Sequence, residues 1–485
     1  MNILAIYDDT GKKSEVIEDI IGDKGFADVV VKKRKLEEYY KDELCRVYPK
    51  LDWRKVHSQF EFSELIKELE LSGISETTRV LHCFSNYIIS NREKAALSLK
   101  KLEFVDENYA VMVGRRAALA MFPSLDDYIV FCRNIISGQK AWDLVRNMKE
   151  SFEIDGLVDI SIIGNFIQCI TGNFDSRYFN SLKGNEYTLV KSSSNKKKIK
   201  AEYNFYHLLP EDMKFWFVMP FNYKEDDSSA SYTMERLHMT DLAIKWVHGS
   251  MDEDEFEELM DKYFYFFRSR HSRECSDSDY KSVSDKLYVD KVRNRISDLK
   301  SLQDYKRIGQ FLTCTEGLQL DELLDKYFYL KEKIENKVNY KREAVIGHGD
   351  PCFANAMYNK STKTLKFIDP KGALNEADLW TNPYYDVAKL SHSVCGRYDF
   401  FNNALFDIKV DTNFDYNLEI PFDNAKYIEI FKRKVEENGF DYWSVRIYEA
   451  SLFLSMLPLH IDNPHKVFGF ILNVRNILRE IEKNV

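Results

Sequence analysis

The chain has 485 residues, more than one hydrophobic core usually holds, so we expect two or three domains. A hydrophobic content of 44% and a charged content of 30% are typical of a globular protein and exclude long disordered stretches, and a net charge of −9 with interspersed acids and bases argues against nucleic acid as the main partner. The eight cysteines form no CxxC pair, which predicts neither a zinc site nor a disulfide framework and fits a reducing cytoplasm.

The first part of the chain alternates strand-like apolar runs with helical patterns, which predicts an α/β domain over residues 1–160. Its opening run is short and is followed at once by acids, unlike a signal peptide, and no apolar stretch is long enough to cross a membrane. We therefore expect a cytoplasmic protein without membrane insertion. The expected strands are "NILAIY" (2–7), "FADVVVKK" (26–33), "TRVLHCF" (78–84), "YAVMVG" (109–114) and "DYIVFC" (127–132).

Closely spaced strand patterns follow and predict a small β-rich lobe over residues 161–240. The turn "TGNFDSRYFN" (171–180) falls where a kinase would have its phosphate-covering loop, but it has one glycine where such loops often have three, so a plain hairpin stays an alternative. The expected strands are "FIQCIT" (166–171), "SRYFNSL" (176–182), "EYTLVKSS" (186–193), "FWFVMPF" (215–221) and "SYTMERL" (231–237), with a helix over 196–210.

From residue 241 onward the patterns are mostly helical, as at 251–270 and 464–484, and predict a large helical lobe over residues 241–485. One loop interrupts them: "VIGHGDPCFANAMYN" (345–359), which continues into the hairpin-like "AMYNKSTKTLKFID" (356–369). His348, Asp350 and Asn355 in this loop match the HxDxxxxN spacing of kinase catalytic loops.

Phosphoryl transfer from a nucleotide needs a group that orients and deprotonates the attacking hydroxyl, ligands for Mg²⁺, and a cation on the phosphate oxygens. Asp350 meets the first need and Asn355 part of the second, whereas we expect His348 to pack and hydrogen-bond so that it fixes the loop. On the motif alone, three common polar residues in an ordinary turn remain an alternative. Asp369 ends the next strand and is a candidate second Mg²⁺ ligand, although aspartate is also a common turn residue.

The candidate cation is Lys191, which ends a strand of the β-rich segment. Glu202 lies near the start of the following helix, an arrangement in which a helix glutamate holds a strand lysine against phosphate. Position in the strand favours Lys191 over its neighbours. The competing lysines are Lys196, Lys197, Lys198 and Lys200.

Three motifs, "HGDPCFAN" (348–355), "FIDPKG" (367–372) and "NPYYDVAKLSHS" (382–393), make the chain from about residue 164 to 485 resemble the aminoglycoside phosphotransferase and choline kinase group of the protein-kinase-like fold. The resemblance implies a two-lobed α+β domain that uses ATP, or another nucleoside triphosphate, with Mg²⁺. It implies Asp350 as catalytic base and Asp386 as the residue that buttresses the loop, with the metal held by Asn355 and Asp369.

The same resemblance implies that the adenine meets the backbone of "TMERLHMTDLA" (233–243), and we count Glu235 of this segment as a nucleotide-binding candidate. Asp-Pro-Lys-Gly at 369–372 replaces the DFG of protein kinases and indicates a small-molecule acceptor. Acceptor candidates near the expected mouth of the cleft, with surface or capping roles as the alternative, are His392, Arg397, Tyr398 and Asp399. A choline-like acceptor would want an aromatic cage, for which candidates are Trp380, Tyr384 and Tyr385.

The order of domains also resembles fusion proteins of bacterial capsule and surface-polysaccharide biosynthesis, whose N-terminal domain is similar to nucleotidyltransferases. This chain departs from that pattern, because "DDTGKKSEV" (8–16) replaces a glycine-rich basic signature and "FSNYIIS" (84–90) stands where a metal-binding aspartate pair is expected. The N-terminal domain is then either a degenerate nucleotidyltransferase or something else.

These observations predict a phosphotransferase with an alcohol group as acceptor, acting on a sugar, amino alcohol or similar compound and supplying a building block or modification for a surface polysaccharide. Two alternatives stay open: a nucleotide-binding pseudokinase or regulatory protein, and a bifunctional kinase and nucleotidyltransferase that makes an activated head group. The sequence leaves the acceptor, the nucleotide preference and the oligomeric state open.

Overall fold

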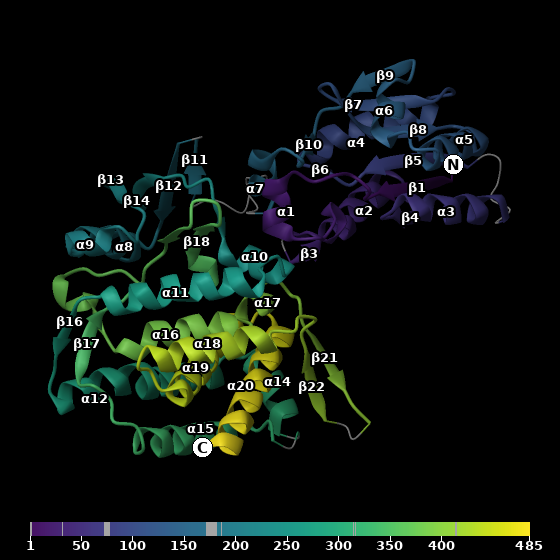
Figure 1. Ribbon diagram of the computed structural model, residues 1–485. Coiled ribbons are helices and arrows are strands. Elements are labelled where there is room, and N and C mark those ends of the chain that lie inside the picture. The colour runs from purple at the N-terminus through teal and green to yellow at the C-terminus, as the bar shows by residue number, and fades with distance from the viewer. Residues whose placement is uncertain are drawn as a thin grey trace. The chain divides into compact units, whose positions relative to one another are not determined.

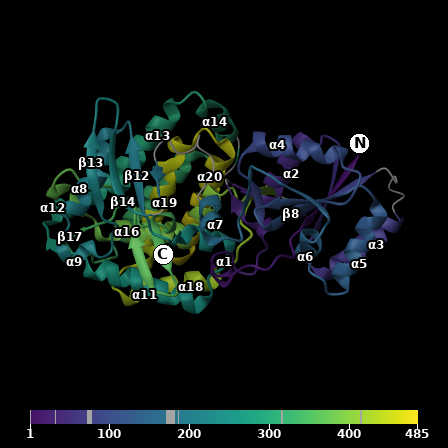
Figure 2. The ribbon, with the colours of Figure 1, turned by 90° about the horizontal axis from the view of Figure 1, so that it is seen from above.

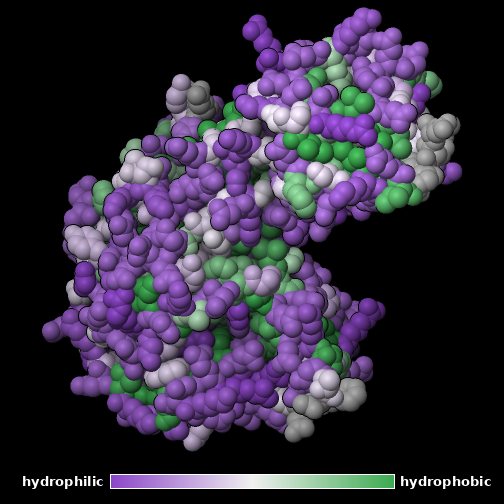
Figure 3. All heavy atoms as spheres, turned by 45° about the vertical axis from the view of Figure 1, so that its right-hand side comes forward, coloured by the Kyte–Doolittle hydropathy of each residue, from purple (hydrophilic) through white to green (hydrophobic). Residues whose placement is uncertain are grey.

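In the computed structural model the chain forms two compact units, Met1–Phe179 and Asn180–Val485. The structure describes residues 2–31, 33–71, 78–170, 182–185, 187–313, 315, 317–412 and 415–485. The expected strand at 176–182 and the expected phosphate-covering turn at 171–180 lie largely or wholly outside these residues. Figure 3 shows hydrophilic side chains over most of the visible face.

The first unit is built on a mixed six-stranded sheet in which β1 is flanked by parallel β4 and β5. Every residue of β1 is buried, as expected for a strand covered on both faces. In the view of Figure 2, α2 and α4 lie on one side of the strands and α3 and α5 on the other. In spatial order the strands are β4 (Leu51–Val56), β1 (Ile3–Asp8), β5 (Arg79–Phe84), β8 (Arg116–Phe122), β7 (Tyr109–Val113) and β9 (Glu150–Glu153).

Two expected strands of this unit are helices. The segment 127–132 lies inside α5 (Leu125–Ile136), whose Ser124 side chain accepts a hydrogen bond from the backbone N–H of Asp127 and whose buried positions recur every three to four residues. Likewise, 166–171 falls mostly in α7 (Ile163–Ile170), which packs against α1 and β10. The other helices are α1 (Glu15–Ile21), α2 (Leu36–Val47), α3 (Gln59–Leu71), α4 (Arg92–Lys101) and α6 (Ala141–Arg146). Two short strand pairs complete the unit: β2 (Val30–Val31) with β3 (Arg34–Lys35), and β6 (Tyr87–Ile89) with β10 (Leu157–Asp159).

The second unit begins with a four-stranded antiparallel sheet crossed by α8 (Lys196–Leu208), as Figure 1 shows. The expected strand at 215–221 is wrong over most of its length, because the strand begins only at Pro220 after the short helix α9 (Glu211–Lys214). In spatial order the strands are β11 (Leu182–Gly184), β12 (Thr188–Ser193), β14 (Ala230–Glu235) and β13 (Pro220–Glu225).

Two three-stranded sheets hold the interrupting loop of the second unit. The predicted hairpin is confirmed: β18 (Ala356–Asn359) pairs antiparallel with β19 (Thr364–Phe367), and β15 (Thr240–Asp241) joins them. On the other side of the loop, β17 (Glu343–Ile346) pairs with β16 (Ser272–Glu274) and β20 (Trp380–Thr381). The loop thus leaves β17 and enters β18, so both of its ends are fixed by backbone hydrogen bonds.

Helices make up most of the rest of the second unit, and Figure 1 shows α11, α16, α18 and α19 running side by side. None of the described helices combines the length and the apolar character needed to span a bilayer. The helices are α10 (Leu242–His248), α11 (Glu253–Ser269), α12 (Asp277–Asp285), α13 (Lys291–Ser301), α14 (Tyr305–Thr313), α15 (Leu320–Glu335), α16 (Pro383–Val394), α17 (Tyr398–Asn402), α18 (Ala425–Glu437), α19 (Tyr442–Met456) and α20 (Pro464–Asn484), and a last hairpin joins β21 (Asp407–Val410) to β22 (Tyr416–Glu419).

Candidate active site

His348 fixes the loop from its centre. Its ring is fully buried and stacks on Phe217, with ring centroids 5.8 Å apart. Nδ1 lies 3.0 Å from the backbone N–H of Asp350, and Nε2 lies 3.0 Å from the carbonyl oxygen of Ile368. Burial lowers the pKa of His348 and outweighs the nearby carboxylates, so the ring is neutral, accepting at Nδ1 and donating at Nε2. The predicted packing role fits this geometry.

Asp386, at the start of α16, holds the backbone of the same loop. Its carboxylate accepts hydrogen bonds from the backbone N–H groups of His348 (2.9 Å) and Gly349 (2.8 Å). Arg270 completes the buried group with an ion pair of 3.0 Å to the same carboxylate. A Cβ on Gly347 would lie 2.4 Å from the Thr381 side chain, so the loop approaches β20 closely enough to need glycine.

The carboxylate of Asp350 faces a lysine that lies outside the HxDxxxxN motif. Lys389 of α16 places Nζ 3.0 Å from Oδ1 of Asp350, whose side chain is 39% exposed. Burial raises the pKa of Asp350, but the Lys389 ammonium outweighs it, and the resulting pKa lies below the ordinary value. Asp350 is therefore ionised at neutral pH and can accept a hydrogen bond from a hydroxyl group.

Asn355 and Asp369 come from the two ends of the β18–β19 hairpin. The Asn355 side-chain N–H₂ donates to the carbonyl oxygen of Asp350 (2.9 Å), which leaves the amide oxygen as its metal-binding atom. The backbone N–H of Ile368 donates to the Asn355 carbonyl (3.0 Å), so the residue before Asp369 is bonded to the loop. Asp369 has a left-handed backbone (φ 53°) and a half-exposed carboxylate.

This donor set fits Mg²⁺, which prefers oxygen ligands and usually takes one or two carboxylates together with phosphate oxygens. Among the described residues, no group of three or more histidine, cysteine or acidic side chains is arranged to hold a metal ion. One amide oxygen and one carboxylate therefore supply a partial shell that a nucleotide's phosphates would complete.

Lys191 and Glu202 meet as the sequence predicts. Nζ of Lys191 lies 2.7 Å from Oε2 of Glu202 and 2.7 Å from Oδ1 of Asp369, and its side chain is 13% exposed. Although burial opposes the charged form, the two carboxylates raise the pKa of Lys191, so it is a permanent cation. Lys198 approaches Glu202 only to 3.7 Å. Glu235 lies at the exposed end of β14, opposite Thr188 of the Lys191 strand.

The acceptor candidates lie deeper than expected. His392 and Asp399 are each 1% exposed, contrary to the expectation that they lie at the mouth of a cleft. The His392 ring stacks on Tyr398 with centroids 4.2 Å apart, and burial lowers its pKa well below the ordinary value. Burial raises the pKa of Asp399 to about 7, and the pKa of Tyr398 to about 12. Arg397, in a left-handed conformation (φ 52°), begins the turn before α17.

Two residues of the site were missed in the sequence. The sequence does contain a signal for Lys389, because this residue follows Asp386 by three positions and so lies on the same face of α16. Arg270 has none, since it pairs with a residue 116 positions away.

No protein-family model matches the chain, and neither does any curated protein sequence. Among solved structures it is similar to those of a thermostable mutant of aminoglycoside phosphotransferase APH(4)-Ia. The apo form matches with 10% identity and a TM-score of 0.32, over 62% of this chain and 94% of that chain. A ternary complex with ADP and hygromycin B matches with 11% identity and a TM-score of 0.35, over 66% and 98%. Values this low carry no functional argument, so the function has to be inferred from the contacts within the chain itself.

Proposed function

We propose that residues 180–485 form a kinase-like, two-lobed domain that transfers the γ-phosphoryl group of ATP, or another nucleoside triphosphate, to a hydroxyl of a small polar acceptor. The observation that carries the proposal is the contact of Lys191 with both Glu202 and Asp369, because it joins the strand lysine and helix glutamate to the segment that follows the HxDxxxxN loop. A chance match of the motif gives no reason for residues 178 positions apart to meet.

Asp350 is the proposed base. It is ionised, partly exposed and held in place through its backbone by His348 and Asn355, so its carboxylate can orient an acceptor hydroxyl and take its proton as the new phosphate ester forms. Asp386 is a positioning residue, since its contacts are with the loop backbone and Arg270.

Asn355 and Asp369 are the proposed Mg²⁺ ligands, and the ion would neutralise phosphate charge during transfer. The carboxylate of Asp369 now pairs with Lys191. Nucleotide binding then has to break the ion pair between Lys191 and Asp369. Lys191 would contact phosphate oxygens instead, while Glu202 keeps the lysine in position. Glu202 is buried and also accepts a hydrogen bond from Tyr232 (3.1 Å), which makes it the fixed partner of the pair.

The charges around Asp350 restrict the acceptor. Lys389 lies against Asp350, and Lys291 donates to the hydroxyl of Tyr385 (2.9 Å). Burial raises the pKa of Tyr385, but both lysines lower it and outweigh the burial, so both ammonium groups lie close to this one side chain. Two ammonium groups beside the base disfavour a quaternary ammonium or amine, and Tyr384 and Tyr385 are too buried to form a cage. We therefore favour a neutral or anionic hydroxyl compound, such as a sugar, over choline or an aminoglycoside.

A cytoplasmic location and a role in supplying a surface polysaccharide belong to the same proposal. The test is transfer of ³²P from γ-labelled ATP in the presence of Mg²⁺, with neutral sugars, sugar acids, glycerol, choline and ethanolamine as acceptors. With the wild-type chain, label should move to a neutral or anionic acceptor. With the Asp369→Asn variant, no label should be transferred. If nucleotide stabilises the protein against heat but no acceptor is labelled, the regulatory alternative is favoured instead.

A further inference from the structure

A large cavity opens in the first unit, at the edge of the sheet where the parallel strands end. Its volume is about 760 Å³, within the range of small-molecule binding sites. β1 ends at Asp8, β5 ends at Phe84 and β4 is followed by His57, and all three residues line the cavity. The chain passes from β1 to β4 on one side and then to β5 on the other, so the cavity lies at a change of direction in strand order. Ligands of open α/β sheets bind at such points.

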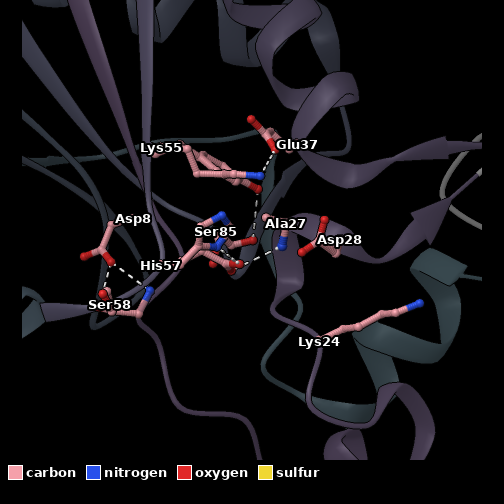
Figure 4. A network of polar contacts seen from close by, with 12 residues as sticks. Asp8, Lys24, Ala27, Asp28, Glu37, Lys55, His57, Ser58 and Ser85 are labelled. Carbon is pink, nitrogen blue, oxygen red and sulfur yellow. Dashed lines mark hydrogen bonds and ion pairs between the residues drawn. The ribbon is translucent and has the colours of Figure 1, made fainter. Parts of the chain in front are cut away.

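Polar groups from these strand ends are held in fixed positions. Figure 4 shows Asp8, His57, Ser58 and Ser85 close together at this edge. Asp8 accepts hydrogen bonds from the backbone and hydroxyl of Thr10 (2.9 and 2.7 Å) and lies 3.2 Å from Nε2 of His82. Asp8 is buried and already bonded, so it offers little free negative charge to a ligand.

The rest of the lining is strongly basic. Five lysines and arginines line the cavity against the single carboxylate of Asp8. Arg116 is partly neutralised by Asp159 at 2.6 Å. The other four side chains are exposed and come from three separate segments: Lys12, Arg115, Lys140 and Arg146, of which Arg146 approaches Asp143 at 3.9 Å. Cations gathered from the β1 loop, the β7–β8 turn and the α6 region raise the local concentration of anions.

An aromatic side chain stands beside these cations. Trp142 lines the cavity, is 46% exposed, and has the Lys140 ammonium 5.3 Å from its ring centroid. An exposed indole next to basic groups suits a ligand that carries a flat or apolar ring as well as a negative charge.

We propose that this cavity binds an organic phosphate, with the phosphate groups on Arg115 and Lys140 and the organic part against Trp142. Guanidinium and ammonium groups form charge-assisted hydrogen bonds with phosphate oxygens. The site belongs to the first unit alone and does not depend on the phosphotransferase activity proposed for the second. Nucleotides and sugar phosphates share this chemistry, and the experiment separates them.

The test is calorimetric titration of the full chain carrying Asp369→Asn, in a buffer that contains EDTA. The substitution and the removal of divalent metal limit nucleotide binding by the second unit. The probes are uridine diphosphate, glucose 1-phosphate and inorganic phosphate. We expect one organic probe to bind, and Arg115→Ala with Lys140→Ala to weaken it about tenfold or more. The control with the same change in charge is Arg133→Ala with Lys149→Ala, both exposed in this unit and outside the cavity, which should change affinity less than twofold.

The outcome also identifies the ligand class. Tighter binding of uridine diphosphate, weakened by Trp142→Ala, assigns a nucleotide, and tighter binding of glucose 1-phosphate assigns a sugar phosphate. The proposal is overturned if no probe binds at millimolar concentration, if inorganic phosphate binds as well as both organic probes, or if the control pair weakens binding as much as the cavity pair.

Discussion

Replacing Asp386 by alanine should destabilise the second unit severely. The substitution leaves the Arg270 guanidinium buried without the carboxylate 3.0 Å away, and removing one member of a buried ion pair costs about 3–5 kcal/mol. The backbone N–H groups of His348 and Gly349 lose their acceptor as well, at about 1–3 kcal/mol for each group that water cannot reach. We expect a total loss of at least about 4 kcal/mol, a large part of the roughly 5–15 kcal/mol that stabilises a typical domain.

The measurement is urea unfolding followed by hydrogen-exchange mass spectrometry of peptides from residues 344–394, which reports on the second unit alone. Asp298→Ala, at an exposed site with a 4.0 Å contact to Arg295, is the matched control. Combining Asp386→Leu with Arg270→Met should recover part of the loss, because no buried charge then stays unpaired. A loss below about 1 kcal/mol for Asp386→Ala would show that the buttress is not structural.

Three further results are expected. Lys389→Met removes the cation that lowers the pKa of Asp350, so the acid limb of the pH profile of kcat/KM should move to higher pH; an unmoved limb would exclude Asp350 as the titrating base. Burial raises the pKa of Asp399 to about 7, so the folded state keeps a proton that the unfolded chain releases above about pH 4, and stability falls as the pH rises to 7. Asp399→Asn should therefore raise the Tm at pH 8, with a gain in the free energy of unfolding of up to about 4 kcal/mol, and should hardly change it at pH 4. An equal gain at both pH values would contradict this. Gly349→Ala puts a Cβ 2.5 Å from that of Lys371 at φ 86° and should lower kcat at least tenfold while Gly11→Ala, in open space, does not, as steady-state assays can check.

Much of the candidate site could be predicted from the sequence because its spacing is local. His348, Asp350 and Asn355 share one loop, and Asp369 follows on the hairpin that the loop enters, so chain connectivity alone brings them near one another. Lys191 could be chosen over the nearby lysines because it lies in the strand, where it reaches Glu202 of α8, whereas Lys196 at the start of α8 donates to the carbonyl oxygen of Asp226.

Other features depend on contacts that a local pattern does not contain. The segment 127–132 has the apolar density of a strand, but Ser124 caps a helix there and α5 packs on α3. Arg270 meets Asp386 because β16, which begins two residues after Arg270, pairs with β17, the strand that leads into the loop. The position of His392 and Asp399 after the catalytic strands predicts that they lie near the surface, yet both are buried, and Tyr398 and Phe453 pack on the ring of His392.

Asp350 is the proposed acceptor of the proton from the hydroxyl that receives the phosphoryl group. The most direct measurement compares the wild-type chain with Asp350→Asn in the transfer of label from γ-³²P ATP to neutral and anionic hydroxyl compounds, with nucleotide affinity measured in parallel. We expect acceptor-dependent transfer that falls at least about a thousandfold in the variant while nucleotide binding is retained. Transfer that survives the substitution, or no acceptor-dependent transfer by the wild type, would contradict it.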